Sequence, residues 1–248
     1  MKNSKQSPIM LWAAPRCAST VFEQTFSQRP NTKTISEPFL DLYYFSQWRC
    51  SNRFGDHKEL QNYPIDSVLA KIKSQTTRLV FIKEMAYQAT PYIDKNFLDS
   101  VVNTFIIRDP HEAIGSWYRV NEFPTEDEFG FTKMQQMWKI VVQELKHRPI
   151  VIEAKRFRQH PEQVIKDYCR RVDIKFYPEM LHWEAHSRTK QNDQPHEIES
   201  RAKWYKTLNN STGILPPTET KTVEIRSQDV LMVERAVKIY QDISPFAL

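Results

Sequence analysis

The chain of 248 residues is long enough for one large α/β domain, and its 40% hydrophobic residues can build a sizeable core, which argues against a disordered protein. The net charge of +5 comes from scattered basic residues rather than a clustered stripe, which argues against a nucleic-acid-binding surface. The three cysteines form no CxxC pair, and the apolar run at residues 9–14 is too short for a signal peptide or a membrane span. We therefore expect one domain over residues 1–248, in a cytoplasmic protein that contacts neither nucleic acid nor membrane.

Short apolar runs alternate along the chain with amphipathic segments of helical length. Because the runs are mostly apolar rather than alternating, they predict strands of a parallel sheet that is buried on both faces. The predicted strands are Ile9–Ala14, Leu79–Ile82, Val101–Ile107 and Pro149–Ile152. The predicted helices are Ser19–Gln28, Ile65–Ser74, Pro110–Val120, Phe131–Lys146, Pro161–Val172 and Gln228–Gln241, and the polar stretch His186–Arg201 predicts a mobile loop. This order predicts a three-layer α/β fold with a central parallel sheet flanked by helices, in which ligands bind beyond the carboxyl ends of the strands.

The turn after the first predicted strand, Pro15–Thr20, has the character of an anion site. The helix that it opens presents unpaired N–H groups and a partial positive charge, Arg16 adds a bidentate phosphate partner, and Ser19 and Thr20 add hydroxyl donors. Ordinary capping of the helix would explain Ser19 without any ligand. In the kinase pattern G-x-x-x-x-G-K-[ST], Ser19 takes the lysine position, which argues against an ATP-using kinase.

A second polar cluster follows the strand that ends at Ile107. Asp109 can cap the next helix and Pro110 suits its first position. Ser116 comes eight residues after Arg108, a spacing that can bring a strand-end guanidinium and a hydroxyl two helical turns later around one anion. A salt bridge at Arg108 and a neutral helix position at Ser116 are the alternative explanation.

Glu37 and Lys83 lie at the ends of two further strand candidates. Lys83 follows residues 79–82 and so comes to the edge of the sheet where ligands bind, although a lysine that reaches solvent from a strand end would look the same. Glu37 follows a short second strand candidate and precedes Pro38, and a carboxylate at a helix start explains it equally well.

The two anion motifs resemble those of the sulfotransferases that use 3'-phosphoadenosine-5'-phosphosulfate (PAPS). The turn Pro15–Thr20 is similar to the family pattern P-[KR]-S-G-[ST]-[ST], and Arg108 through Ser116 matches R-[DN]-P-x5-S. The resemblance runs from about residue 9 to 217 and implies a P-loop-like sulfotransferase fold in which two strand ends hold the two phosphates of the donor. It assigns the 5'-phosphosulfate to Arg16, Cys17, Ala18, Ser19 and Thr20, and the 3'-phosphate to Arg108 and Ser116.

Two positions depart from the family's phosphosulfate turn. Cys17 replaces a serine and removes one hydroxyl contact. Ala18 replaces a glycine, which predicts that the turn avoids a strongly positive φ at this residue.

The resemblance also implies a catalytic pair. Sulfuryl transfer, like phosphoryl transfer, depends on positioning and charge stabilisation, and it requires no metal. In the tyrosylprotein-type branch of the family, a glutamate about twenty residues after the loop arginine is the base, and a lysine followed by an acid ends a middle strand. Glu37 is thereby implied as the base and Lys83 as the group that stabilises the leaving oxygen, with Glu84 as the reserve base. Met85 stands where the cytosolic branch carries a histidine base.

Toward the C-terminus the resemblance is looser. The family's tyrosine beside the adenosine corresponds to Ala154, so another aromatic residue must pack the adenine. Lys203 and Trp204 resemble the loop that closes over the donor, which implies a phosphate contact for Lys203. His182 and His186 lack an HExxH pattern and a third ligand, so we expect no metal.

The sequence therefore predicts an enzyme that transfers a sulfuryl group from PAPS to a hydroxyl or amine of a small-molecule acceptor, such as a natural product. Residues 39–48 and 121–131 are rich in aromatic and acidic side chains and are candidates for the acceptor pocket, with core packing as the alternative. Two other functions stay open, a small-molecule or nucleotide kinase of related fold and a non-catalytic nucleotide-binding protein with the sulfotransferase fold.

Overall fold

A sheet of five parallel strands in the order β2-β3-β1-β4-β5 forms the centre of the molecule. The computed structural model describes residues 7–55, 59–73, 79–120, 122–186, 202–217 and 223–248. The strand order reverses beside β1, which is where open α/β sheets bind ligands. The strands are β1 (Ile9–Ala13), β2 (Thr32–Ser36), β3 (Leu79–Met85), β4 (Val102–Ile107) and β5 (Ile150–Glu153). The predicted parallel sheet is confirmed.

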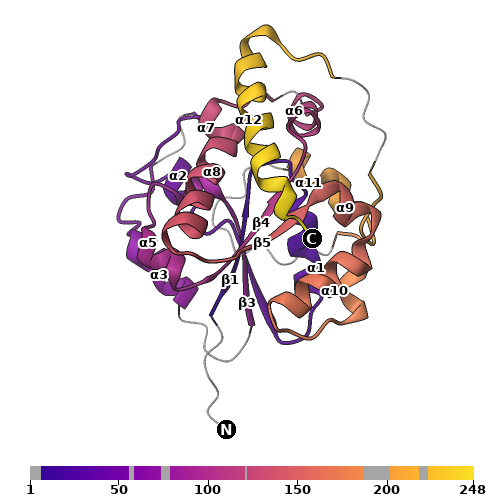
Figure 1. Cartoon of the computed structure of the whole chain (residues 1–248). Coiled ribbons are helices and arrows are strands. Elements are labelled where there is room, and N and C mark those ends of the chain that lie inside the picture. The colour runs from indigo at the N-terminus through magenta and orange to yellow at the C-terminus, as the bar shows by residue number, and fades with distance from the viewer. Residues whose placement is uncertain (1–6, 56–58, 74–78, 121, 187–201, 218–222) are drawn as a thin grey trace.

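Helices cover both faces of the sheet and complete the predicted three layers (Figure 1). One face packs against α1 (Ser19–Ser27), α9 (Ala154–Gln159) and α10 (Pro161–Arg171). The other face packs against α3 (Ile65–Lys73), α5 (Lys95–Asp99), α6 (Pro110–Tyr118), α8 (Phe131–Lys139) and α12 (Val230–Ile243). Shorter elements are α2 (Leu40–Tyr44), α4 (Ala86–Ala89), α7 (Glu126–Phe129), α11 (Ala202–Asn209) and the 3-10 turns Pro178–Leu181, Ser227–Asp229 and Ser244–Phe246.

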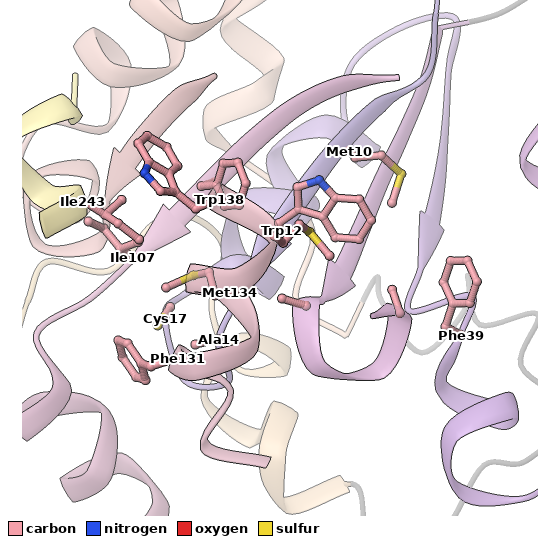
Figure 2. Packing of buried hydrophobic residues seen from close by; sticks show 14 of the residues in the cluster. Met10, Trp12, Ala14, Cys17, Phe39, Ile107, Phe131, Met134, Trp138 and Ile243 are labelled. Carbon is pink, nitrogen blue, oxygen red and sulfur yellow. The ribbon is translucent and has the colours of Figure 1, made fainter. Parts of the chain in front are cut away.

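The two hydrophobic clusters divide the residues of β1 between them, because successive side chains of a strand point to opposite faces. Met10 and Trp12 belong to the cluster under α8 and α12, which Figure 2 shows around Trp12. The two polar residues of β4 both have hydrogen-bond partners, Asn103 in this cluster and Thr104 on the opposite face of the sheet, where its hydroxyl contacts Tyr168. Asn103 Oδ1 accepts a hydrogen bond from Trp12 Nε1 at 2.9 Å, and Thr104 Oγ1 donates to the carbonyl oxygen of Met10 at 2.8 Å. Buried polar groups with partners do not interrupt a strand.

The structure corrects two predicted boundaries. β3 continues to Met85, three residues past its predicted end, so Lys83 and Glu84 lie within the strand. The predicted helix 131–146 divides, because α8 ends at Lys139 and a π-helix continues from Ile140 to Glu144. The other predicted elements are present with ends shifted by one or a few residues, and β2 confirms the short second strand candidate.

The predicted loop 186–201 lies outside the described residues except for His186. Among the helices that the structure describes, none has both the length and the apolar character that crossing a bilayer requires.

Candidate active site

A cavity of about 530 Å³ lies at the carboxyl edge of the sheet. Its wall comes from the turn after β1, the residues that follow β2 and β3, the helix α6, and α11 with the segment after it. Cys17 and Lys83 lie behind this wall rather than in it, and the side chain of Lys203 is outside the described part of the chain. The predicted site residues that line the cavity are Arg16, Ala18, Ser19, Thr20, Glu37, Arg108 and Ser116.

The turn between β1 and α1 contains two non-glycine residues in the left-handed region, with φ of 66° at Arg16 and 63° at Ala18. The prediction that Ala18 avoids a positive φ is therefore wrong. A left-handed L-residue costs about 1–2 kcal/mol, so the surrounding packing must hold the turn in place. Gly130 supplies part of that packing, because a Cβ there would lie 2.8 Å from Cδ of Pro15.

The side chains of the turn point in two directions. Cys17 is fully buried in the cluster that Figure 2 shows, and burial raises the pKa of its thiol to about 12. It therefore offers an anion only its backbone N–H. Ser19 and Thr20 occupy the first turn of α1 and line the cavity, where the unpaired N–H groups of a helix start also point.

The turn after β1 contacts the predicted motif after β4 directly. Nε of Arg16 donates to Oγ of Ser116 at 2.9 Å, and Nη1 of Arg108 donates to the carbonyl oxygen of Arg16 at 3.0 Å. Arg108 also pairs with Glu112, one turn along α6, at 2.9 Å. Burial, together with the charges of Arg108 and Arg119, lowers the pKa of Arg16 to about 10. The guanidinium therefore stays charged at neutral pH, in surroundings that an anion would make more favourable.

Three further arginines that the sequence did not single out, Arg53, Arg119 and Arg158, line the cavity. Burial and the charge of Arg108 lower the pKa of Arg119 and of Arg158. Arg158 also donates hydrogen bonds to the two backbone carbonyls of residues 215–216, at 2.9 and 2.6 Å. Arg119 comes three residues after Ser116, a spacing that places both on the same side of a helix, so the sequence could have indicated Arg119 as a site residue. The sequence around Arg158 contains no such pattern.

Glu37 and Lys83 form a buried ion pair between Oε1 and Nζ. Lys83 has no exposed surface and Glu37 is 6% exposed. Glu37 has a φ of 44°, and its N–H donates to the carbonyl oxygen of Lys83 at 2.7 Å, which turns the chain after β2 toward β3. A buried charge is tolerated only with a partner, and the ion pair supplies one for each of these residues.

Glu84, the reserve base of the sequence analysis, has a different place. It is fully buried, it does not line the cavity, and its two carboxylate oxygens accept from the backbone N–H groups of Phe39 and Met85 at 2.8 and 2.7 Å. Burial and the neighbouring charge of Glu37 raise the pKa of Glu84 well above its ordinary value. These contacts give Glu84 a structural role in joining the ends of β2 and β3.

A hydrogen-bonded chain of side chains leads away from Glu37. Nε2 of Gln88 lies 3.5 Å from Glu37 Oε2 and 3.1 Å from Tyr87 Oη, and the hydroxyls of Tyr87 and Tyr44 are 2.8 Å apart. Oη of Tyr44 donates to Glu128 at 3.5 Å. This chain runs from the carboxylate past Tyr44, which lines the cavity, to Glu128, the ion-pair partner of Arg53.

The two segments predicted for an acceptor pocket differ in outcome. From residues 39–48, Leu40 and Tyr44 line the cavity. From residues 121–131 no described side chain does, because Phe129 and Phe131 are buried in the core. For this segment the alternative interpretation, core packing, is the one that the structure shows, since its apolar residues cover the sheet.

Two aromatic residues of α11, Trp204 and Tyr205, line the cavity near the arginines. The ring of Trp204 lies 5.0 Å from the guanidinium carbon of Arg16. Within the described ranges, no three His, Cys, Asp or Glu side chains are grouped so that they could hold a metal ion.

A family model described as "Sulfotransferase domain" matches residues 7–245 of the chain. Two curated proteins of Arabidopsis thaliana, branched-chain-amino-acid aminotransferase-like proteins 1 and 2, are 24% and 22% identical over 246 residues. The match covers 94% of this chain and 40% of each relative, so the chain spans about two fifths of the length of these proteins.

Three solved structures share the fold. The sulfotransferase domain from the curacin biosynthetic pathway has a TM-score of 0.53 at 13% identity, with 96% of this chain and 97% of that chain covered. A sulfotransferase from Alicyclobacillus acidocaldarius has 0.52 at 13% identity, with 94% and 96% covered. The sulfotransferase domain from the Synechococcus PCC 7002 olefin synthase has 0.50 at 15% identity, with 95% and 97% covered. The predicted P-loop-like fold is confirmed.

Proposed function

The chain belongs to the sulfotransferase-domain family, and on that premise we propose that it transfers a sulfuryl group from PAPS to a hydroxyl or amine of a small-molecule acceptor, such as a natural product. One observation carries the proposal: a single cavity joins a cluster of arginines to the buried Glu37–Lys83 pair. The arginines suit an anionic donor, and the carboxylate suits an acceptor that must lose a proton.

The residues present fit a nucleotide with phosphates on both sides of its ribose. Arg16, Ser19 and Thr20, with the N–H groups of Cys17 and Ala18, would hold the 5'-phosphosulfate. Ser116, together with the arginines Arg108, Arg119 and Arg158, would hold the 3'-phosphate, and Lys203 remains a further candidate. The cavity volume of about 530 Å³ is typical of a small-molecule site, and α11 supplies the aromatic rings for the adenine through Trp204 and Tyr205.

The chemistry needs a proton acceptor and a charge near the leaving oxygen. When bound, the donor supplies a sulfuryl group that bonds to the acceptor atom as its bond to the 5'-phosphate oxygen breaks. Glu37 takes the proton that the acceptor loses. Proton uptake neutralises Glu37 and so removes the negative charge beside the ammonium of Lys83, just as the departing oxygen gains its electron pair. Lys83, which lies behind Glu37, thus supplies its charge when the reaction needs it.

Binding measurements separate this proposal from its two rivals. We expect the protein to bind 3'-phosphoadenosine-5'-phosphate (PAP), the donor product, without metal, and to bind ATP with magnesium weakly, because the turn has no lysine for a γ-phosphate. Transfer of labelled sulfate from PAPS to any member of a metabolite panel would exclude a non-catalytic protein. Tight binding of ATP with magnesium, and none of PAP, would overturn the proposal in favour of a kinase.

Arg108→Ala tests the nucleotide site. Loss of one charge-assisted contact should weaken PAP binding about 10- to 100-fold in calorimetry. Arg156→Ala is the matched control, because Arg156 lies on α9 but does not line the cavity, and it should leave the affinity unchanged. Unchanged PAP affinity in the Arg108 variant would contradict the assignment.

A further inference from the structure

Gln88 lines the cavity beside Glu37, and its Oε1 is a buried oxygen without a hydrogen-bond partner among the described residues. Gln88 lies on α4, directly after β3, and is 2% exposed. Its amide is therefore held at the acceptor end of the cavity, next to the carboxylate that we propose as the base.

The contacts of the amide fix which way it points. A carboxylate only accepts hydrogen bonds, so the amide nitrogen must be the atom that faces Glu37 Oε2, at 3.5 Å. The same nitrogen donates to Tyr87 Oη at 3.1 Å. A flip of the amide would put its oxygen against the Glu37 carboxylate and lose that contact, whereas the Tyr87 hydroxyl, which can donate as well as accept, could pair with either amide atom. Oε1 is therefore held away from both partners, as an acceptor that the described side chains leave unused.

Burial of this oxygen without a hydrogen bond lowers the stability of the protein unless a ligand donates to it. A buried polar group without a partner destabilises a protein by about 1–3 kcal/mol. The same cavity has apolar and aromatic lining residues, Leu40, Tyr44, Phe54 and Trp117, and the guanidinium carbon of Arg53 lies 5.3 Å from the Trp117 ring. The indole N–H of Trp117 is likewise buried without a partner. Polar atoms of this kind in an apolar pocket are the ones that orient a ligand and select it.

We propose that Oε1 of Gln88 accepts a hydrogen bond from the acceptor molecule, and that the acceptor accordingly carries a second N–H or O–H beside the reacting one. The inference rests on the proposed role of Glu37. An alcohol with a single O–H gives its proton to Glu37 and leaves Gln88 without a partner. A primary amine, or a hydroxyl with another hydroxyl on the neighbouring carbon, supplies both Glu37 and Gln88. The acceptor class is therefore an amine or a vicinal diol on a largely apolar body.

Matched pairs of small probes test the proposal by calorimetry. The pairs are phenol with catechol, and benzyl alcohol with benzylamine, each measured on the full chain with and without PAP. We expect the second member of at least one pair to bind about 10- to 100-fold more tightly, and this ratio to fall about tenfold in Gln88→Met. The pair that responds tells whether the second donor is a hydroxyl or an amine. Ratios that are the same in the wild type and in Gln88→Met, or no binding of any probe, would overturn the proposal.

The ratio of the two affinities within a probe pair separates recognition by Oε1 from a structural effect of the substitution. Methionine has a length similar to that of glutamine. The variant also loses the contact between the amide nitrogen and Glu37, but this loss weakens the binding of both members of a pair alike. A change in the ratio therefore reports the lost oxygen. Tyr87→Phe is the control, because it removes the other partner of the Gln88 nitrogen and keeps Oε1, and it should preserve the ratio. If PAP does not bind and no sulfate is transferred, the proposed function fails, while the ratios without PAP still decide the role of Gln88.

Discussion

Replacing Glu37 with glutamine removes the proposed base and nearly preserves its shape. An amide oxygen cannot take the acceptor's proton, so kcat should fall by about 10²- to 10⁴-fold, the usual contribution of a general base. The contacts between Arg16, Arg108 and Ser116 do not involve Glu37, so the affinity for PAP should stay within about twofold.

The same substitution should also lower stability, and the structure gives the size of the effect. Lys83 has no exposed surface, and Glu37 is the carboxylate paired with its ammonium. Removing one partner of a buried ion pair costs about 3–5 kcal/mol, and the lower end applies because the glutamine oxygen still accepts a hydrogen bond from Nζ. A second change, Lys83→Met, removes the buried positive charge that Glu37 no longer balances and should return at least half of the lost stability.

Urea unfolding and transfer of labelled sulfate measure the two effects separately. The single variant Glu37→Gln and the double variant with Lys83→Met should both be inactive, while only the first is strongly destabilised. Wild-type kcat in Glu37→Gln with intact PAP binding would refute Glu37 as the base. Unchanged stability in that variant would refute the account of the ion pair.

Two further predictions concern stability. Ala18→Gly should raise the free energy of unfolding by about 0.5–1 kcal/mol, since relief of the left-handed strain outweighs the added chain entropy, whereas Ala113→Gly inside α6 should lower it by about 1 kcal/mol. A lower thermal midpoint for Ala18→Gly would contradict this. Although burial acts to raise it, the hydrogen bond and charge of Arg53 lower the pKa of Glu128 below its ordinary 4.5. Glu128 thus stabilises the fold above that pH, and the stabilisation is lost as the pH falls through the depressed value. Glu128→Gln should therefore be less stable than the wild type at pH 7 in urea titrations, with a difference that shrinks as the pH falls below 4.5; a constant difference would contradict the shift.

The fold followed from the sequence wherever burial dictates the residue pattern. The apolar runs of β1 and β4 lie in the middle of the sheet, and their predicted ends differ from the observed ones by one residue. The predicted end of β3 failed at Lys83, because a charged pair normally ends a buried run. Here Glu37 partners the lysine, and two backbone N–H groups partner Glu84, so the strand continues. Such partners come from other parts of the chain, which a local pattern does not contain.

The candidate site followed from the sequence only in part. Arg16 and Arg108 could be singled out because Arg16 lies in the turn between a strand and a helix and Arg108 directly follows a strand, and such positions imply an edge of the sheet. Arg119 and Arg158 sit on helices, and only the way those helices pack brings them to the same cavity. Gln88 shows the same limit. Neither its residue type nor its position in the sequence predicts a role. That its Oε1 has no hydrogen-bond partner can be recognised only when the contacts of its neighbours are known.

Arg16, Ala18 and Glu37 all have a positive φ and all line the cavity, in a chain with only 4 glycines. A glycine at any of these positions would have indicated a left-handed residue from the sequence alone. Arg16 and Glu37 cannot be glycine, because the proposed site uses their side chains. The strain must then be held by tertiary contacts, namely the packing of Gly130 on the turn and the hydrogen bond from Glu37 to the backbone of Lys83. Strained residues that persist only because their surroundings fix them concentrate where function requires one geometry. These tertiary contacts, which the sequence does not reveal, therefore hold the guanidinium of Arg16 and the carboxylate of Glu37 in position.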